Sequence, residues 1–199
     1  PWIYSRRSIE KLHMKKLKQL KYRSEQVAGR RILKLAGTLD PTNHKESVFH
    51  RLKNLEDIEE IRKLKAAYSS ACDDDHNGEA VAALFVEDGT WQKIEEPNVT
   101  GDGKQVGRAE ISAFMFGLRE ARFIKRSSHM ISNPVIHVNG DRATGLWKFI
   151  MLYSHVDGRF FRIIGRYEDT YIRHNGKGFF QSLTAIVEEN NPYMESDRL

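Results

Sequence analysis

The sequence has one cysteine, Cys72, among its 199 residues, so no internal disulfide can form. It has no apolar run near the ~18 residues that a membrane-spanning helix needs. Its eight histidines show no metal-binding spacing, since neither HxH nor HExxH occurs and no second cysteine is present. We therefore expect a cytoplasmic protein that uses no metal and no cofactor.

Several common catalytic motifs are also missing. The sequence has no phosphate-binding loop, no dinucleotide-binding fingerprint and no nucleophile elbow of the Ser–His–Asp hydrolases. What it does have is 40% hydrophobic and 30% charged residues, with ten Phe, seven Tyr and three Trp. That composition is typical of a globular protein, and the aromatic residues suffice for a core or for an apolar pocket.

Positive charge is concentrated at the N-terminus. Up to Leu35 there are eleven Lys and Arg against two acids, a net charge of +9, whereas the whole chain carries +5. Such a segment can contact a partner or an anionic surface, or remain a solvated extension. We predict a basic extension and linker over residues 1–46 and a domain over 47–199, and expect no nucleic-acid binding by that domain. Because the sequence starts at Pro1, we expect further residues before it, and a targeting sequence there stays open.

The first helix of the domain ends in three aspartates. Its apolar face is formed by Leu55, Ile58, Ile61, Leu64, Tyr68 and Cys72. Asn54 and Asp57 resemble a capping box, which predicts that the helix begins at Asn54. Asp73, Asp74 and Asp75 then face the negative end of the helix dipole, an unfavourable place for carboxylates. This suggests a chemical role for at least one of them; a solvated loop that caps the next helix is the alternative.

Two more helices and a strand follow. We predict a short helix over 78–85 with Val81, Leu84 and Phe85 facing inward, and a strand over 90–94. A long loop over 95–107 precedes a third helix over 108–123. These elements supply the helical part of the fold.

The C-terminal half consists of four long strands, over residues 129–138, 142–155, 159–173 and 177–189. The segments NGD, VDG and HNGKG separate them, and each is a hairpin signal. We predict an α+β fold in which three N-terminal helices pack on a strongly curved, mainly antiparallel sheet. This cone-shaped half-barrel would enclose a hollow of the kind in which ligands bind.

Alternation along two strands predicts which residues line this hollow. One face carries Trp147, Phe149, Met151 and Tyr153, and on the next strand Phe161, Ile163, Gly165 and Tyr167. Such a lining suits a flat, apolar ligand with few oxygens, and an ordinary core is the alternative. Gly165 favours a pocket because it removes side-chain volume. The opposite face, with Arg162, Arg166 and Glu168, should be solvated.

His129 is the remaining candidate for acid/base chemistry. If the sheet packs on the first helix, the start of the strand with His129 approaches the helix end. An aspartate there could orient the imidazole and stabilise its charged form, which leaves the other ring nitrogen as a base. Helical spacing does not choose among Asp73, Asp74 and Asp75.

Three segments, IRKLKAAYSSACDDDHNGEAVAALFVEDGTW, GRAEISAFM and SSHMISNPVIHVNGDRATGLWKF, carry a resemblance to a known family. Over residues 54–189 the chain resembles the SnoaL-like family of the nuclear transport factor 2-like superfamily, which has a cystatin-like roll. It is similar to scytalone dehydratase, bile acid 7α-dehydratase and hexachlorocyclohexane dehydrochlorinase. These enzymes use an Asp–His pair as a base in an elimination.

The resemblance assigns the pair to Asp73 and His129, and a supporting tyrosine to Tyr68. Other groups of these enzymes are not matched. A further acid of the bile acid enzyme falls on Met151 and its arginine falls near Glu188. A second histidine of scytalone dehydratase falls near Tyr153, and its pocket Ser and Asn near Gly165 and Tyr167. The reaction type therefore stays open.

From these observations we expect a cofactor-free acid/base enzyme of the dehydratase, isomerase or polyketide cyclase-like type. Its substrate would be a hydrophobic, oxygenated small molecule. Catalytic roles are assigned to Asp73, His129 and Tyr68, and substrate contacts to Cys72, Trp147, Phe149, Met151, Tyr153, Gly165 and Tyr167.

The alternative functions are a non-catalytic subunit similar to the small β subunit of an aromatic-ring dioxygenase, and a binding module without turnover. The resemblance implies a homo-oligomer, a trimer before a dimer, with Leu146, Ile150 and Leu152 in the interface.

Overall fold

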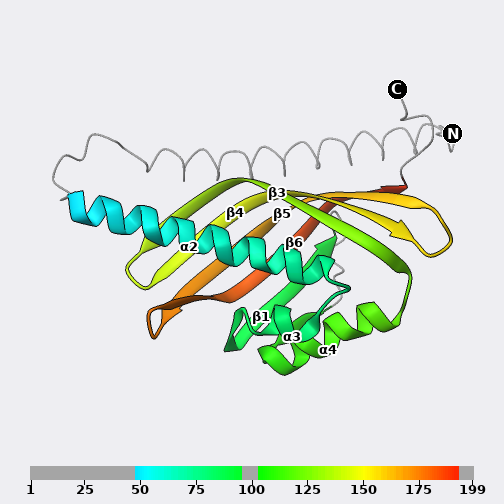
Figure 1. Ribbon diagram of the computed structural model, residues 1–199, viewed down its shortest axis with the longest axis horizontal. Helices are drawn as coiled ribbons and strands as arrows, with labels where there is room; N and C mark the ends of the chain where they lie inside the picture. The colour runs from blue at the N-terminus through cyan, green and yellow to red at the C-terminus, as the bar shows by residue number, and fades with distance from the viewer. Residues whose placement is uncertain (1–47, 96–102, 193–199) are drawn as a thin grey trace, which may run out of the picture. The chain divides into compact units, whose positions relative to one another are not determined.

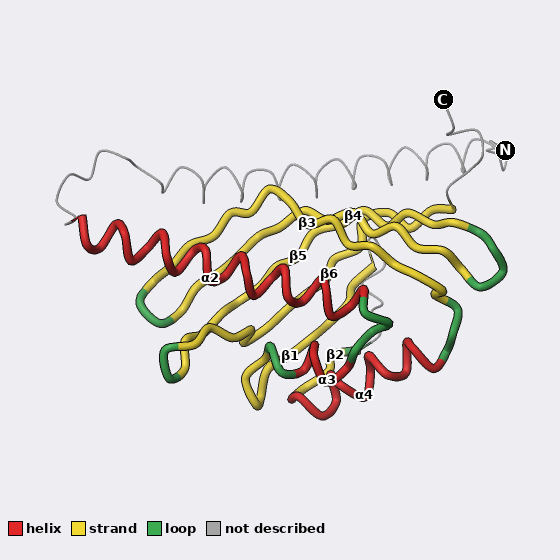
Figure 2. Tube along the Cα trace, in the orientation of Figure 1, coloured by secondary structure: helices red, strands yellow, loops and turns green. Residues whose placement is uncertain are grey.

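The computed structural model describes residues 48–95 and 103–192. The predicted basic extension and linker over 1–46 lie outside these residues, as does most of the loop predicted over 95–107. The described chain runs in the order α2, α3, β1, β2, α4, β3, β4, β5 and β6. Figure 1 shows these elements along the chain, and Figure 2 separates the helices from the strands by colour.

The first described helix, α2 (Val48–Asp73), is longer than the sequence predicted. Its start at Asn54 was wrong, because Asp57 does not turn back to cap the helix. Asp57 instead pairs with Lys53 on the same helix and with Arg173 on β5. Leu55 was also misplaced on the inner face, since it is 63% exposed. Ile61, Tyr68 and Cys72 are buried as predicted.

The segment after α2 forms two helices and two strands: α3 (Gly78–Ala82), β1 (Phe85–Glu95), β2 (Lys104–Val106) and α4 (Gly107–Glu120). The Asn77 side chain caps α3 by accepting a hydrogen bond from the Ala80 N–H. The predicted strand over 90–94 was too short, and Phe85 begins β1 instead of ending the helix. The strand β2 lies where a loop was predicted, and α4 ends three residues before the predicted end at Phe123.

The four long strands are β3 (Ile124–Asn139), β4 (Arg142–His155), β5 (Phe160–His174) and β6 (Lys177–Pro192). They form successive antiparallel hairpins, as predicted. In the last turn Asn175 and Gly176 both have positive φ, 52° and 76°, which suits the twist of a two-residue hairpin. β3 begins earlier than predicted, at Ile124.

The sheet contains six strands in the order β2-β1-β6-β5-β4-β3. β1 pairs with β6 in parallel, and every other pairing is antiparallel. The sheet is therefore mixed and mainly antiparallel, and it is curved without closing. The α+β prediction is confirmed.

The helices cover one face of this sheet. In Figures 1 and 2, α2 crosses the strands β3 to β6 while α3 and α4 lie beside β1. The covered face carries the buried side chains Trp147, Phe149, Met151 and Tyr167. On the other face Glu188 pairs with Lys148 and Arg166. This places the aromatic residues between helices and sheet, the side that sequence alternation left undecided. Within 48–95 and 103–192, no helix is both long and apolar enough to cross a membrane.

Candidate functional site

The three aspartates at the end of α2 have three different partners. Asp74 accepts a hydrogen bond from Asn77 at 3.0 Å, and Asp75 pairs with Arg119 on α4 at 2.8 Å. Asp73 alone reaches the sheet, where it contacts His129 on β3. Two of the acids therefore fix the local loop and the third meets an imidazole, and a chemical role for Asp73 stays a prediction.

The carboxylate of Asp73 takes part in three hydrogen bonds with β3, two of them with His129. Asp73 Oδ1 lies 2.7 Å from His129 Nδ1, and Oδ2 accepts the backbone N–H of His129 at 2.8 Å. The hydroxyl of Ser127 donates to Oδ1 at 2.9 Å. β3 is an edge strand. Asp73 accepts a hydrogen bond from one backbone N–H group of this strand, that of His129. One carboxylate therefore fixes both the strand and the imidazole ring that the strand carries.

The charge on Asp73 determines which nitrogen of His129 carries the proton. Burial alone raises the pKa of Asp73, but the hydrogen bonds from His129 and Ser127 outweigh burial and hold the pKa below its ordinary value. The carboxylate is thus ionised at neutral pH and can only accept hydrogen bonds, so Nδ1 must be the protonated nitrogen. In the neutral ring the lone pair then lies on Nε2, the arrangement that a general base requires. The His129 side chain is 8% exposed and that of Asp73 25%.

Tyr68 lies deeper in the core. Its hydroxyl accepts a hydrogen bond from Trp91 Nε1 at 2.9 Å, and its ring meets that of Tyr167 edge to face. Burial raises the pKa of Tyr68 well above its ordinary value, and burial does the same for Tyr167. Both phenols therefore keep their protons at neutral pH and remain able to donate a hydrogen bond.

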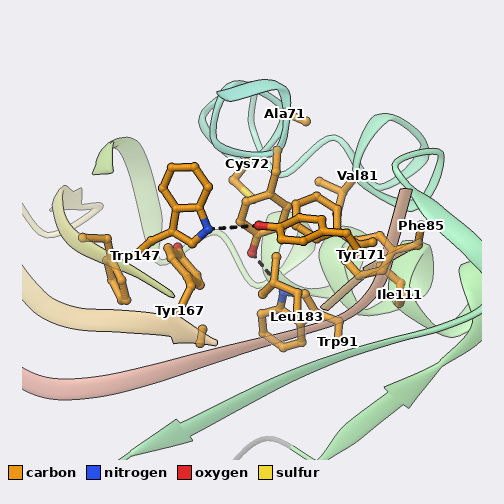
Figure 3. Close-up of a cluster of buried hydrophobic side chains, with 14 of the residues drawn as sticks. Ala71, Cys72, Val81, Phe85, Trp91, Ile111, Trp147, Tyr167, Tyr171 and Leu183 are labelled. Carbon is orange, nitrogen blue, oxygen red and sulfur yellow. Dashed lines mark hydrogen bonds between the residues drawn. The ribbon is translucent and has the colours of Figure 1, made fainter. Parts of the chain in front are cut away.

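The predicted ligand lining is found on the covered face. Phe149 stacks on Tyr167 with ring centroids 4.4 Å apart, and Met151 lies opposite His129 in the pairing of β3 with β4. Tyr153 is only partly buried and stacks on Phe161. Figure 3 shows Trp147, Tyr167 and Cys72 together in the buried cluster. Their role in binding a ligand stays a prediction.

Gly165 does not open space, contrary to the sequence argument. A Cβ at this position would overlap the carbonyl oxygen of Ile186 and lie 2.7 Å from Phe149 Cε1. The pairing of β5 with β6 also shifts register between Ile164 and Gly165. The volume freed by the glycine is thus filled by the neighbouring strand and by the Phe149 ring.

The thiol of Cys72 is enclosed by the protein. Burial raises its pKa to about 12, so it is uncharged at neutral pH. Its Sγ is visible in Figure 3 within the cluster of buried side chains. Cys72 is therefore suited to packing against a neighbour and not to nucleophilic chemistry.

A buried ion pair escaped the sequence reasoning. Lys65 Nζ lies 2.9 Å from Asp169 Oδ2, with side-chain exposures of 1% and 0%. The ammonium group is also 3.5 Å from the ring centroid of Tyr167, a cation–π contact. Tyr171 donates to Asp169 at 2.7 Å. Tyr171 also accepts from Trp147, the hydrogen bond drawn between these two residues in Figure 3.

Burial lowers the pKa of Lys65 to about 8, although Asp169 opposes this shift.

The sequence did contain a pattern that indicates the Lys65–Asp169 pair. Lys65 falls on the same helical stripe as Ile61, Tyr68 and Cys72, and Asp169 alternates with Tyr167 and Tyr171. One charged residue on an otherwise apolar helix face and one on an otherwise apolar strand face indicate that the two side chains meet in the core.

Within the described ranges, no cluster of three or more His, Cys, Asp or Glu is arranged to hold a metal ion. The polar groups near His129 are instead a carboxylate, a hydroxyl and a second imidazole, that of His76. A positive charge on His129 lowers the pKa of His76. These groups can move protons and bind oxygens.

Comparison with known proteins points to one family. A family model described as a SnoaL-like domain matches residues 53–184. No curated protein matches the sequence. Among solved structures, a nuclear transport factor 2-like protein with a cystatin-like fold from Novosphingobium aromaticivorans is 27% identical. Its TM-score is 0.59, over 75% of this chain and 90% of that one.

Two enzymes have the same fold. A proposed scytalone dehydratase from Novosphingobium aromaticivorans is 24% identical, with a TM-score of 0.60 over 71% of this chain and 90% of that one. The hexachlorocyclohexane dehydrochlorinase LinA-type3 from Novosphingobium barchaimii is 18% identical, with a TM-score of 0.62 over 73% and 95%. At these identities the likeness concerns the fold alone.

Proposed function

Since the chain belongs to the SnoaL-like family, we propose that it is a cofactor-free acid/base enzyme of the lyase or isomerase type. Its proposed substrate is a hydrophobic small molecule with a carbonyl group and an acidic C–H beside it. The observation that carries the proposal is the contact of Asp73 with His129, in which an ionised carboxylate leaves Nε2 as the free base.

In the proposed reaction, Nε2 of His129 takes the proton next to the carbonyl group. The electron pair of that C–H bond forms a carbon–carbon double bond, and negative charge develops on the carbonyl oxygen. The charge on Asp73 stabilises the imidazolium. The same imidazolium then returns its proton, either to a departing hydroxyl group in an elimination or to another carbon in an isomerisation.

Two of the similar structures support an elimination over other outcomes. One bears the name of a dehydratase and the other that of a dehydrochlorinase, and both names describe the loss of a small molecule from a carbon skeleton. Tyr68 is the proposed hydrogen-bond donor from the core, since burial keeps its phenol protonated.

The test uses two probes of this substrate class, 2-tetralone and 4-hydroxy-4-phenylbutan-2-one. Exchange of the α-protons of 2-tetralone in D₂O measures proton abstraction, and water loss from the second probe measures elimination. We expect His129→Gln and Asp73→Asn to lower both rates about 10²- to 10⁴-fold. The matched controls are Asp74→Asn, whose partner is Asn77, and His137→Gln, an exposed histidine on the same strand. Equal rates in wild type and in both dyad variants would exclude the mechanism.

A homo-oligomer is the proposed assembly, a trimer before a dimer. Ile150 and Leu152 are each 40% exposed on the uncovered face of β4. Light scattering of the purified protein measures the mass of the assembly. Co-purification with a larger redox subunit, together with inactivity on both probes, would instead favour the role of a non-catalytic subunit.

A further inference from the structure

His76 has an unusual place at the end of α2. It follows Asp73 by three residues, and both Asp75 and His76 have left-handed backbones, with φ of 51° and 52°. The backbone N–H of His76 donates to Cys72 and that of Asn77 to Ala71, so the turn is fixed by two nested hydrogen bonds. The chain therefore changes direction within three residues of Asp73, the aspartate that contacts His129.

The His76 residue is 7% exposed, whereas Asp74 and Asp75 beside it are exposed. Those aspartates and Asn77 all have side-chain partners, but the His76 ring forms no hydrogen bond with any residue in 48–95 or 103–192. The ring N–H of His76 therefore has no acceptor among these residues.

The ring nitrogens of His76 are not sealed in. Within the described ranges, the fully enclosed polar atoms without a hydrogen bond are Lys65 Nζ, Arg162 Nε and Asp169 Oδ1, and no atom of His76 is among them. The residue is therefore mostly covered by protein, and its ring nitrogens keep some solvent exposure. A ring N–H of this kind can donate a hydrogen bond to a ligand oxygen.

His76 is connected to the proposed base through Asp73, which it follows by three residues and which contacts His129. Burial lowers the pKa of His76, and the charge of His129 lowers it further, while Asp75 and Asp73 act in the opposite direction. His76 is therefore a neutral imidazole at neutral pH, with one N–H to donate. A neutral donor does not compete with His129 for the proton that the reaction moves.

We propose that the His76 ring binds the carbonyl oxygen of the substrate and stabilises the enolate that forms when His129 removes the neighbouring proton. The proposal rests on the proposed function and adds a second reacting residue to it. Tyr68 remains the proposed donor from the core, and the ring N–H of His76 is a second donor, without an acceptor among residues 48–95 and 103–192. A donor aimed at a developing negative charge contributes about 10²- to 10³-fold in rate.

The first arm of the test measures binding and needs no turnover. The probe is 2-naphthol, which has the shape of the enol of 2-tetralone. With ¹⁵N-labelled histidine, we expect naphthol to shift the ring nitrogen signals of His76 in the wild-type protein. His76→Phe, which keeps the ring but removes the donor, should weaken naphthol binding at least tenfold, whereas His76→Gln should bind within threefold of wild type. The control His137→Phe changes an exposed histidine and should bind as wild type does.

The second arm measures the α-proton exchange of 2-tetralone. We expect His76→Phe to lower kcat about 10²- to 10³-fold, with KM changed less than kcat and with the signal of the His129 Nδ1–H unchanged. His76→Gln should recover at least a tenth of the wild-type rate. Wild-type kcat in His76→Phe would overturn the proposal, as would naphthol binding that leaves His76 unaffected or no naphthol binding at all. If naphthol binds at His76 but no protein exchanges 2-tetralone, His76 is the oxygen-binding residue and the proposed function fails.

Discussion

Asp73 holds His129 at two points, because one carboxylate oxygen accepts the backbone N–H at 2.8 Å and the other meets Nδ1 at 2.7 Å. This double contact joins the end of α2 to the edge strand of the sheet. It fixes the position of the strand and the orientation of the ring together. Any change at Asp73 should therefore affect both stability and reactivity.

The first prediction concerns acid stability. The pKa of Asp73 is lower in the folded protein than the unfolded value of 3.8, so its stabilisation is present above pH 3.8 and is lost as the pH falls through the lower folded value. We expect Asp73→Asn to be less stable than wild type by about 1 to 3 kcal/mol at pH 7. As the pH falls below 3.8 and through the lower folded value, the two proteins should converge. Urea denaturation between pH 2 and pH 7 measures this difference.

Asp57 and Glu188 also have lowered pKa values, so they contribute to acid unfolding in both proteins and cancel in the difference. Asp74→Asn serves as the control, since it changes an exposed acid beside Asp73. A constant difference between wild type and Asp73→Asn across the whole pH range would contradict the prediction.

The second prediction concerns the buried pair of Lys65 and Asp169. Removing one partner leaves the other charge buried without compensation, so Lys65→Met should cost about 3 to 5 kcal/mol of the free energy of unfolding. Asp169→Leu should cost a similar amount and also removes the acceptor of Tyr171. In the double variant no buried charge is left, and its loss should be smaller than the sum of the two.

Urea denaturation of the four proteins completes this double-mutant cycle. The matched surface pair is Lys63 with Glu60, exposed on α2, for which the same cycle should give less than about 1 kcal/mol. Additive losses at Lys65 and Asp169 would mean that the two charges do not interact.

The third prediction concerns Gly165. Because a Cβ there would overlap the Ile186 carbonyl group and crowd Phe149, Gly165→Ala should destabilise the protein by about 1 to 3 kcal/mol. Gly117→Ala is the control, since nothing lies within 4 Å of a Cβ at that position on α4. It should stabilise the helix by about 0.5 to 1 kcal/mol. Thermal unfolding of both variants separates them, and a stable Gly165→Ala protein would show that the volume is empty.

The fourth prediction concerns the thiol of Cys72. Because the thiol is buried and its pKa is raised to about 12, it should not react with Ellman's reagent in the folded protein within an hour at pH 8. In 6 M guanidinium chloride one thiol per chain should react within minutes. Prompt reaction in the folded protein would show that solvent reaches the cluster around Cys72.

The architecture was largely contained in the sequence. Alternation and hairpin signals predicted four of the strands, helical periodicity predicted the buried side of α2, and the α+β fold and the SnoaL-like family are confirmed. These features follow from local patterns, since a residue's neighbours in sequence decide which face it shares. The division into residues 1–46 and 47–199, the substrate contacts and the oligomeric state stay predictions.

Contacts between segments that are far apart in the sequence could not be predicted from these local patterns. Asp57 pairs with Arg173, which lies more than a hundred residues later, and the parallel pairing of β1 with β6 joins opposite ends of the domain. The prediction that Gly165 favours a pocket was wrong, because the volume of a missing side chain can stay empty or be filled by neighbouring residues. Only the positions of Phe149 and Ile186 decide between the two.

The sequence by itself determined that an aspartate would end the first helix of the domain and that a histidine would lie on the first of the four long strands, because periodicity and turn signals place both. Helical spacing did not choose among the three adjacent acids, and the family resemblance assigned Asp73. Only the tertiary structure shows which of the three side chains reaches the edge of β3. It also brought Lys65 to Asp169 and left His76 without a partner among the described residues. Contacts between distant segments are set by packing, and no local pattern encodes them.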